Sequence, residues 1–159
     1  MPERPRTIRE RLVLRFFHLV FLATRPMTLG VRALVFDEQK RVFLVRHTYV
    51  PGWHLPGGGV EAGETMLASL ARELAEEGNI LMEGEPRLHG VFFNKTISRR
   101  DHVAVYVVTR FRQTAPRPPD REIAEARFFA RDALPADVSR ATLTRLAEAL
   151  DGAPIAQLW

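Results

Sequence analysis

Residues 57–80 read GGGVEAGETMLASLARELAEEGNI, and this stretch decides the fold of the chain. From residue 65 to residue 77 it contains strong helix formers and neither Gly nor Pro, and Thr65 is a suitable N-cap. At about 100° per residue, Glu73, Glu76 and Glu77 share one face of such a helix, whereas the leucines form an apolar stripe on another. The spacing therefore predicts a helix that packs through its leucines and projects three carboxylates together.

The three glutamates point to a divalent metal. Like charges at this spacing destabilise a helix unless a cation compensates them. Mg²⁺ or Mn²⁺ would do so, because Mg²⁺ takes oxygen ligands and is commonly held by a few carboxylates together with substrate phosphates. The alternative is a solvated acidic helix face that binds nothing. Four glycines within residues 57–63 favour the metal site, because they let the backbone approach a phosphate closely.

The full pattern, Gly58-x5-Glu64-x7-Arg72-Glu73-Leu74-x-Glu76-Glu77, resembles the Nudix box of the Nudix hydrolases. The resemblance implies an α/β fold, an α/β/α sandwich around a mixed β-sheet, over about residues 28–150. We expect two parts: an apolar and basic helical segment at residues 1–26 and a Nudix hydrolase domain at residues 27–159. One position departs from the box, because Asn79 replaces its last glycine. Asn tolerates the left-handed end of a helix nearly as well, so we expect the local geometry to survive.

The resemblance also implies roles for individual residues. Glu64 and Arg72 would brace the glycine loop against the helix, and Arg72 counts among the catalytic residues. The general base is left open between Glu73 and Glu122, with Glu125 as the next choice, because the family places this base either on the helix or on a later loop. The metal ligands it implies are the Gly57 carbonyl and the carboxylates of Glu73, Glu76, Glu77 and Glu122.

Substrate contacts are expected around the glycine loop. Gly58 and Gly59 would approach a phosphate, and Arg46 would reach one from the strand that enters the loop. Trp53 or Tyr49 could stack on a base, although packing in the core or at the rim is the alternative for both. The resemblance predicts a Mg²⁺-dependent pyrophosphohydrolase that cleaves a nucleoside diphosphate linked to another moiety, in the nucleotide-sugar, dinucleotide or nucleoside triphosphate class. The alternative is a non-catalytic Nudix domain that binds a nucleotide as a sensor.

Composition limits the remaining possibilities. The chain has 159 residues and is 46% hydrophobic, enough for one sizeable core. It contains no cysteine, which excludes disulfides, thiolate metal sites and cysteine nucleophiles. The formal charge is +4, which suits a phosphorylated small-molecule substrate. Nucleic acid is not the expected partner, because the arginines form no run interleaved with aromatic residues. We expect a cytoplasmic protein.

The N-terminal segment lies outside the Nudix resemblance. Residues 12–23 are apolar apart from Arg15 and His18, and several arginines precede them. Twelve residues are too few to span a bilayer, and no small-x-small cleavage site follows as in a signal peptide. One alternative is a helix that lies on a membrane surface through residues 8–23. The favoured interpretation is a helix packed against the domain or against a second subunit in a homodimer.

Alternating apolar patterns and turn residues define the other elements. The chemistry of Asp37-Glu-Gln-Lys40 predicts a hairpin between the first two strands, and residues 94–101 read as a polar hairpin loop. The elements predicted besides the helix at 65–77 are strands at 28–36, 41–46, 88–93, 102–111 and 126–130 and an amphipathic helix at 139–150.

Overall fold

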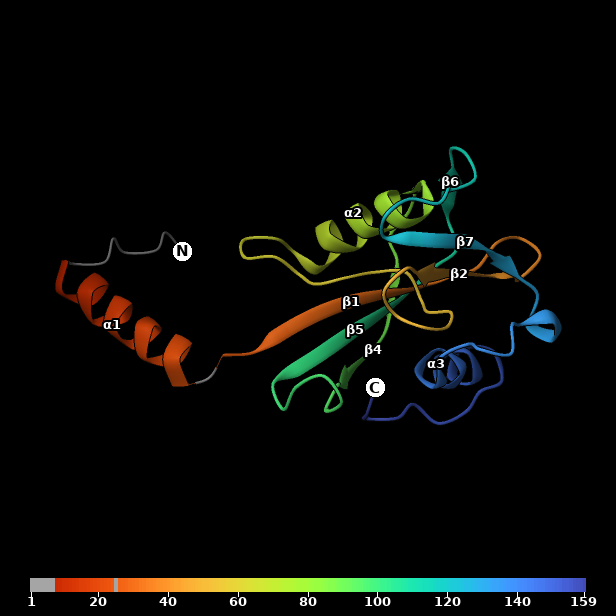
Figure 1. The fold of residues 1–159 in the computed structure, drawn as a ribbon. Helices are drawn as coiled ribbons and strands as arrows, with labels where there is room; N and C mark the ends of the chain where they lie inside the picture. Colours follow the sequence, from red (N-terminus) through yellow and green to blue (C-terminus); the bar gives the residue numbers. More distant parts are fainter. Residues whose placement is uncertain (1–7, 25) are drawn as a thin grey trace.

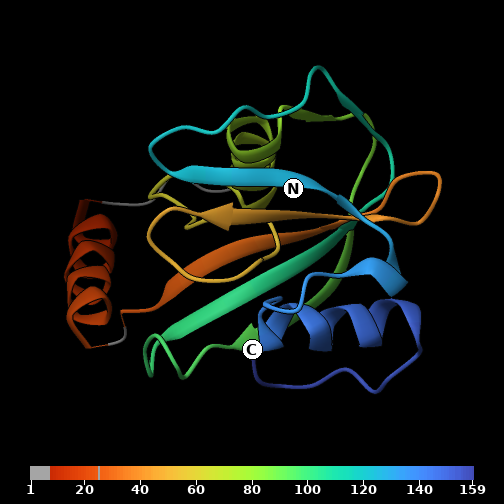
Figure 2. The same ribbon diagram turned by 45° about the vertical axis from the view of Figure 1, so that its right-hand side comes forward.

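Two helices cover opposite faces of a layer of strands (Figures 1 and 2). A computed structural model describes residues 8–24 and 26–159; residues 1–7 and 25 of the predicted N-terminal segment lie outside the described residues. The elements in chain order are α1 (Ile8–Thr24), β1 (Thr28–Val35), β2 (Val42–His47), α2 (Met66–Gly78), β3 (Ile80–Met82), β4 (Arg87–Phe93), β5 (Asp101–Val108), β6 (Phe111–Gln113), β7 (Ile123–Phe129), a 3₁₀ turn (Arg131–Ala133) and α3 (Arg140–Leu150).

The strand pairing is mixed. β5 lies between β1, to which it is parallel, and β4, to which it is antiparallel. The register of β1 against β5 runs from Thr28 opposite Asp101 to Val35 opposite Val108. β2 pairs with β7, and β3 pairs with β6, both antiparallel. With α2 on one face and α3 on the other, this confirms the predicted α/β/α sandwich.

The glycine loop, here taken as residues 54–63, lies between β1 and β2. The Val31 and Ala33 amides donate to the carbonyls of Gly58 and Pro56 at 2.8 and 2.9 Å. On its other side, Val45 and His54 exchange two backbone hydrogen bonds of 3.0 and 2.8 Å. The loop therefore acts as an irregular strand between two regular ones.

The prediction that strands 28–36 and 41–46 pair with each other as a hairpin is correct at the turn and wrong beyond it. The turn itself forms, because the Lys40 amide donates to the Asp37 carbonyl at 2.9 Å. After a single bridge between Phe36 and Val42, however, β1 and β2 diverge. Turn chemistry is local, whereas these two buried strands satisfy their backbone groups with β5, β7 and the inserted loop.

Side chains that alternate in direction along β1 contribute to both hydrophobic clusters of the domain, one on each face of the sheet. Val31, Ala33 and Val35 point into the cluster that packs under α2, together with leucines of that helix. Leu34, one residue out of phase, belongs to the second cluster, which includes Leu146 of α3. Strand geometry requires this division, since successive side chains point to opposite faces.

The ends of α2 follow the sequence prediction. The Thr65 hydroxyl accepts a hydrogen bond from the Ala68 amide at 3.1 Å, as an N-cap does. Asn79 ends the helix in the left-handed region, at φ 52° and ψ 34°, and its amide donates to the Ala75 carbonyl. The short strands β3 and β6 were not predicted separately; three-residue strands carry too little periodicity to recognise.

Helix α1 stands beside the sandwich and not on it (Figure 1). Its large apolar side chains are exposed, Phe16 and Leu19 at 64% each. The predicted packing of this helix against its own domain is therefore wrong for the single chain. Across residues 8–24 and 26–159, no helix combines the length and apolarity that crossing a membrane requires.

Candidate active site

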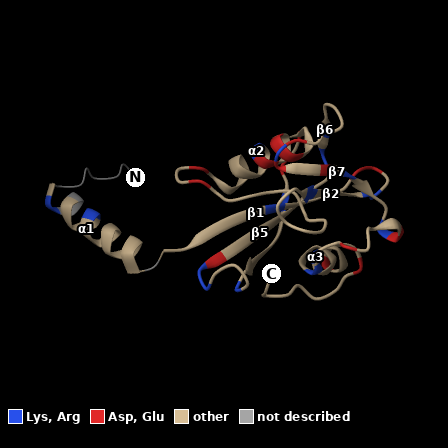
Figure 3. Cartoon of the chain, viewed as in Figure 1, with Lys and Arg blue, Asp and Glu red and all other residues tan. Residues whose placement is uncertain are grey.

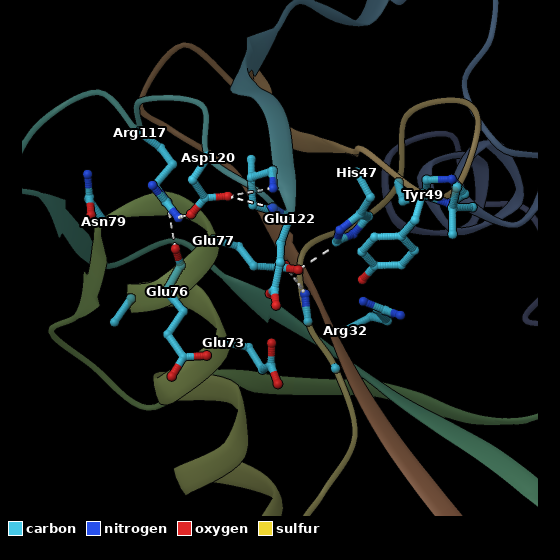
Figure 4. Close-up of a pocket in the computed structure, with 16 residues that line it drawn as sticks. Arg32, His47, Tyr49, Glu73, Glu76, Glu77, Asn79, Arg117, Asp120 and Glu122 are labelled. Carbon is cyan, nitrogen blue, oxygen red and sulfur yellow. Dashed lines mark hydrogen bonds and ion pairs between the residues drawn. The ribbon is translucent and has the colours of Figure 1, made fainter.

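A cavity of about 730 Å³ opens where the second half of α2 meets the glycine loop and the connection between β6 and β7 (Figure 4). Its walls are mostly polar, and the sequence-predicted residues that line it are Gly57, Gly58, Glu73, Glu76, Glu77 and Glu122. Residues that were not predicted as site residues also line it, among them Arg32, His47 and Arg117. The structure thus brings the predicted metal-binding residues to one cavity.

Glu77 is the most buried of the three helix glutamates, at 8% exposure. One carboxylate oxygen, Oε2, accepts the Gly57 amide hydrogen bond at 2.7 Å, and Oε1 lies 3.5 Å from His47 Nε2. Burial raises the pKa of Glu77 to about 7, against the opposing effects of the Gly57 hydrogen bond and the Arg32 charge. A carboxylate in this position would gain from a cation beside it.

Arg72 joins the loop to the helix. Its Nε lies 3.1 Å from Glu64 Oε1, and its Nη1 lies 2.7 Å from Glu73 Oε1 and 3.5 Å from Glu76 Oε2. Its Nη2 also donates to the Gly59 carbonyl at 3.2 Å. Hydrogen bonds from Arg72 lower the pKa of the Glu64 carboxyl, and the carboxylates in turn raise the pKa of Arg72. These contacts match the bracing role predicted for Glu64 and Arg72.

Two glycines are needed for close approach at the cavity. Gly57 has a φ of 135°, and a Cβ there would lie 2.1 Å from the Val31 carbonyl oxygen. A Cβ on Gly58 would lie 2.2 Å from Glu73 Oε1. The loop backbone and the Glu73 carboxylate are therefore in direct contact.

The connection before β7 is fastened to the end of α2. Arg117 Nε donates to the Glu76 carbonyl at 2.6 Å, and its Nη2 pairs with Asp120. The Asp120 carboxylate accepts the amides of Glu122 and Ile123 at 2.8 Å each, and these bonds, with that from Arg117, lower the pKa of Asp120 to about 2. The result is that Glu122 faces the helix glutamates across the cavity (Figure 4).

Three predicted substrate contacts, Gly59, Trp53 and Arg46, do not line this cavity. Trp53 is 3% exposed and packs in the core, with its ring 4.7 Å from that of Phe129. Arg46 forms an ion pair of 3.1 Å with Glu125 and places its guanidinium over Trp53. The burial of Trp53 contradicts its predicted stacking on a base, whereas the contact of Arg46 with a phosphate stays a prediction. Of the two aromatic candidates it is Tyr49, 69% exposed, that lines the cavity.

Arg32 is, with Arg117, a cation of the cavity that sequence reasoning missed. Its Nη1 is buried and has no hydrogen-bond partner among the described residues. A signal was present in the sequence, since Arg32 interrupts the apolar run of a buried strand between Val31 and Ala33. A buried guanidinium nitrogen without a partner is costly, and a guanidinium at a cavity is suited to an anionic ligand.

The donor chemistry fits Mg²⁺ or Mn²⁺. All predicted ligands are carbonyl or carboxylate oxygens, which suit these ions. Over the described part of the chain, no three His, Asp or Glu side chains already surround a common metal position. Glu73 is turned towards Arg72, and the Glu76 side chain is 63% exposed. Such an open set suits a metal that completes its coordination with water and phosphate rather than a closed protein cage.

A second cavity, of about 410 Å³, shares Arg32 and His54 with the first. Its walls include the side chains of Ile97 and Trp159. Asn94, 6% exposed, also lines it; its Nδ2 donates to Asp101 Oδ2 at 2.8 Å, whereas its buried Oδ1 has no partner among the described residues. The orientation of the amide is thus set, and its Oδ1 is buried without a partner in the wall of the cavity.

Comparisons with known proteins agree with the box and the fold. A family model described as NUDIX domain matches residues 26–148. A putative 8-oxo-dGTP diphosphatase of Bacillus subtilis (strain 168) is 40% identical over 50 residues, 31% of this chain and 34% of that protein. An RNA pyrophosphohydrolase of Gluconobacter oxydans (strain 621H) is 40% identical over 60 residues, 34% of this chain and 35% of that protein. The matches thus span about a third of these curated relatives.

Solved structures extend the likeness over most of the fold. The MutT NUDIX hydrolase from Burkholderia pseudomallei has a TM-score of 0.64 and 26% identity, covering 75% of this chain and 95% of that one. A UDP-X diphosphatase structure has a TM-score of 0.60 and 24% identity, covering 91% of this chain and 74% of that one. At the lower identity, the second likeness concerns the fold alone.

Proposed function

The chain belongs to the Nudix family, and on that premise we propose that it is a Mg²⁺- or Mn²⁺-dependent hydrolase of the diphosphate bond in a nucleoside diphosphate derivative. One observation carries the proposal: Gly57, Glu73, Glu76 and Glu77 supply oxygen donors to one cavity, with Glu122 opposite them. The names of the relatives, a diphosphatase and a pyrophosphohydrolase, point to the same bond.

The helix glutamates and the Gly57 carbonyl would hold the metal. When bound, the metal would neutralise phosphate charge and ease ionisation of the attacking water. Arg32, which lines the cavity, would bind a phosphate oxygen through its guanidinium. Arg72, held by Glu64, would keep Glu73 at the loop, where Gly58 leaves space for its carboxylate.

We assign the general base to Glu122. Glu73 already accepts a hydrogen bond from Arg72 at 2.7 Å, which makes it a poorer proton acceptor. The Glu122 side chain lines the cavity, and among the described residues it has no hydrogen-bond or ion-pair partner. Glu122→Gln should lower kcat at saturating metal while leaving metal affinity much less affected, whereas loss of a ligand would weaken both.

The second cavity would hold the nucleoside. It adjoins the first at Arg32, so a diphosphate bound at Arg32 would direct its attached group there. A small shift of the cavity wall on binding would bring the unpartnered Oδ1 of Asn94 within reach of a group that donates an N–H, such as the exocyclic amine of adenine, cytosine or guanine. Asn94→Ala should therefore remove the preference for an amino-bearing base over its analogue without the amine.

A substrate panel tests the proposal. It would contain nucleoside triphosphates, nucleotide sugars and dinucleotides, each assayed for released phosphate or nucleotide with and without Mg²⁺. The expected result is metal-dependent turnover of at least one class, strongly lowered by Glu76→Gln. Tight binding of one compound, with no turnover of any compound, would overturn the proposed hydrolase activity. It would support the alternative, a non-catalytic domain that binds a nucleotide as a sensor.

A further inference from the structure

Helix α1 exposes a wide apolar surface. Ten of its large apolar side chains are at least 38% exposed. At about 100° per residue, nine of them occupy an arc of roughly 240°, whereas Arg15 and His18 lie on the remaining stripe with Leu22 between them. Among the described side chains, the polar ones within the arc are Arg9 in the first turn and Thr24 at the end, whose hydroxyl donates to the Val20 carbonyl.

The net positive charge of the chain lies in its first 25 residues, which include α1. The first 25 residues contain six arginines and two glutamates, a formal charge of +4, which is the charge of the whole chain. Residues 26–159 contain 17 basic and 17 acidic side chains and are neutral overall. The segment that exposes apolar surface therefore also carries the excess charge.

A second basic and apolar element lies near the start of β1, where the chain arrives from α1. The loop between β4 and β5 exposes Lys95, Arg99 and Arg100, and Ile97 beside them is 77% exposed. Among the described residues these three basic side chains form no ion pair. The loop is joined to the start of β1, because the Thr28 amide donates to the Arg100 carbonyl at 3.0 Å. Figure 3 shows this basic loop at the end of the domain where α1 connects.

We propose that α1 and residues 95–100, together called the basic end, bind an anionic lipid membrane, with α1 lying in the plane of the interface. A single partner helix would cover a stripe of about 100°, which leaves much of the 240° arc in water. The lipid interface covers a wide arc, and the basic stripe would face the headgroups. The basic side chains of α1 and of residues 95–100 favour anionic over neutral lipid.

Vesicle co-sedimentation of the full-length protein tests this inference. The probes are phosphatidylcholine vesicles and vesicles that also contain phosphatidylserine. We expect at least about tenfold tighter binding to the anionic vesicles, weakened by added salt. The double variant Phe16→Gln and Leu19→Gln, on the arc, should lose at least about tenfold in binding, whereas Leu22→Gln, on the basic stripe, should stay within about twofold.

A variant and a matched control test the loop between β4 and β5. Arg99→Gln with Arg100→Gln should weaken binding to anionic vesicles, whereas Arg87→Gln, exposed on β4 outside the basic end, should not. Circular dichroism melting of each variant shows that the domain remains folded. Equal binding to both kinds of vesicle, or no effect of the arc variant, overturns the inference. If the protein does not bind vesicles, and sedimentation velocity shows a dimer that the arc variant breaks, the inference is also overturned. The apolar arc would then be the contact surface for a second copy of the chain.

Discussion

Gly58→Ala should separate activity from stability. Its new Cβ would lie 2.2 Å from Glu73 Oε1 and 2.5 Å from Cδ, whereas ordinary contacts begin at 3.4 Å. The carboxylate must therefore move by about 1.2 Å, and a displacement on the order of 1 Å at a reacting centre costs roughly 100-fold in rate. The obstacle is the end of a flexible side chain, so the free energy of unfolding should fall by no more than about 1 kcal/mol.

The neighbouring glycines are matched controls. Gly59→Ala adds a Cβ with no atom within 4 Å, and it should leave the rate within about twofold and the stability within about 0.5 kcal/mol. Gly57→Ala must relieve a 2.1 Å contact with the Val31 carbonyl at a φ of 135°, and it should cost about 3 kcal/mol or more of stability.

The assay is Mg²⁺-dependent release of nucleotide from the best substrate of the panel, measured beside urea unfolding of each variant. The reasoning predicts a slow but stable Gly58→Ala, a normal Gly59→Ala and an unstable Gly57→Ala. A fully active Gly58→Ala would refute the placement of Glu73 against the loop. Equal losses of activity in Gly58→Ala and Gly59→Ala would show that general loop distortion, and not Glu73, limits the rate.

Three further predictions follow from single side chains. Glu76→Gln should lower turnover by about 100-fold or more with an unchanged melting temperature, and near-normal rates at saturating Mg²⁺ would contradict its role as a ligand. Asn79→Ala should destabilise the protein by about 1 kcal/mol in urea unfolding, whereas Asn79→Gly should not, because the position is left-handed. Trp53→Ala should cost about 3–5 kcal/mol in the same measurement without changing which nucleotides bind; a selective rise in KM for one base would return Trp53 to the substrate site.

Local order was predictable from the sequence. Helix 65–77, its Thr65 cap and the left-handed Asn79 depend on contacts within a few residues, and the structure has all three. The predicted loop at 94–101 also connects two antiparallel strands. The three glutamates reach one cavity because helix geometry alone puts them on one face.

Long-range pairing was not predictable in the same way. The turn at Asp37 suggested a hairpin, but the strands that pair with β1 and β2, namely β5 and β7, lie more than 60 residues further along the chain. Trp53 and Arg46 looked like ligands because they flank the loop, yet the packing of β7 buries the first and pairs the second with Glu125. Arg32 was missed because only the tertiary fold shows that a charge inside a strand faces a cavity.

The insertion of the glycine loop between β1 and β2 has a dynamic consequence. Swinging the loop away would break its hydrogen bonds to Val31, Ala33 and Val45 at the same time. Amide hydrogens at these positions should therefore exchange slowly, through openings of the sheet and not of the loop alone, even before substrate is present. A diphosphate would meet a loop that is already ordered, so little conformational entropy is lost when it binds.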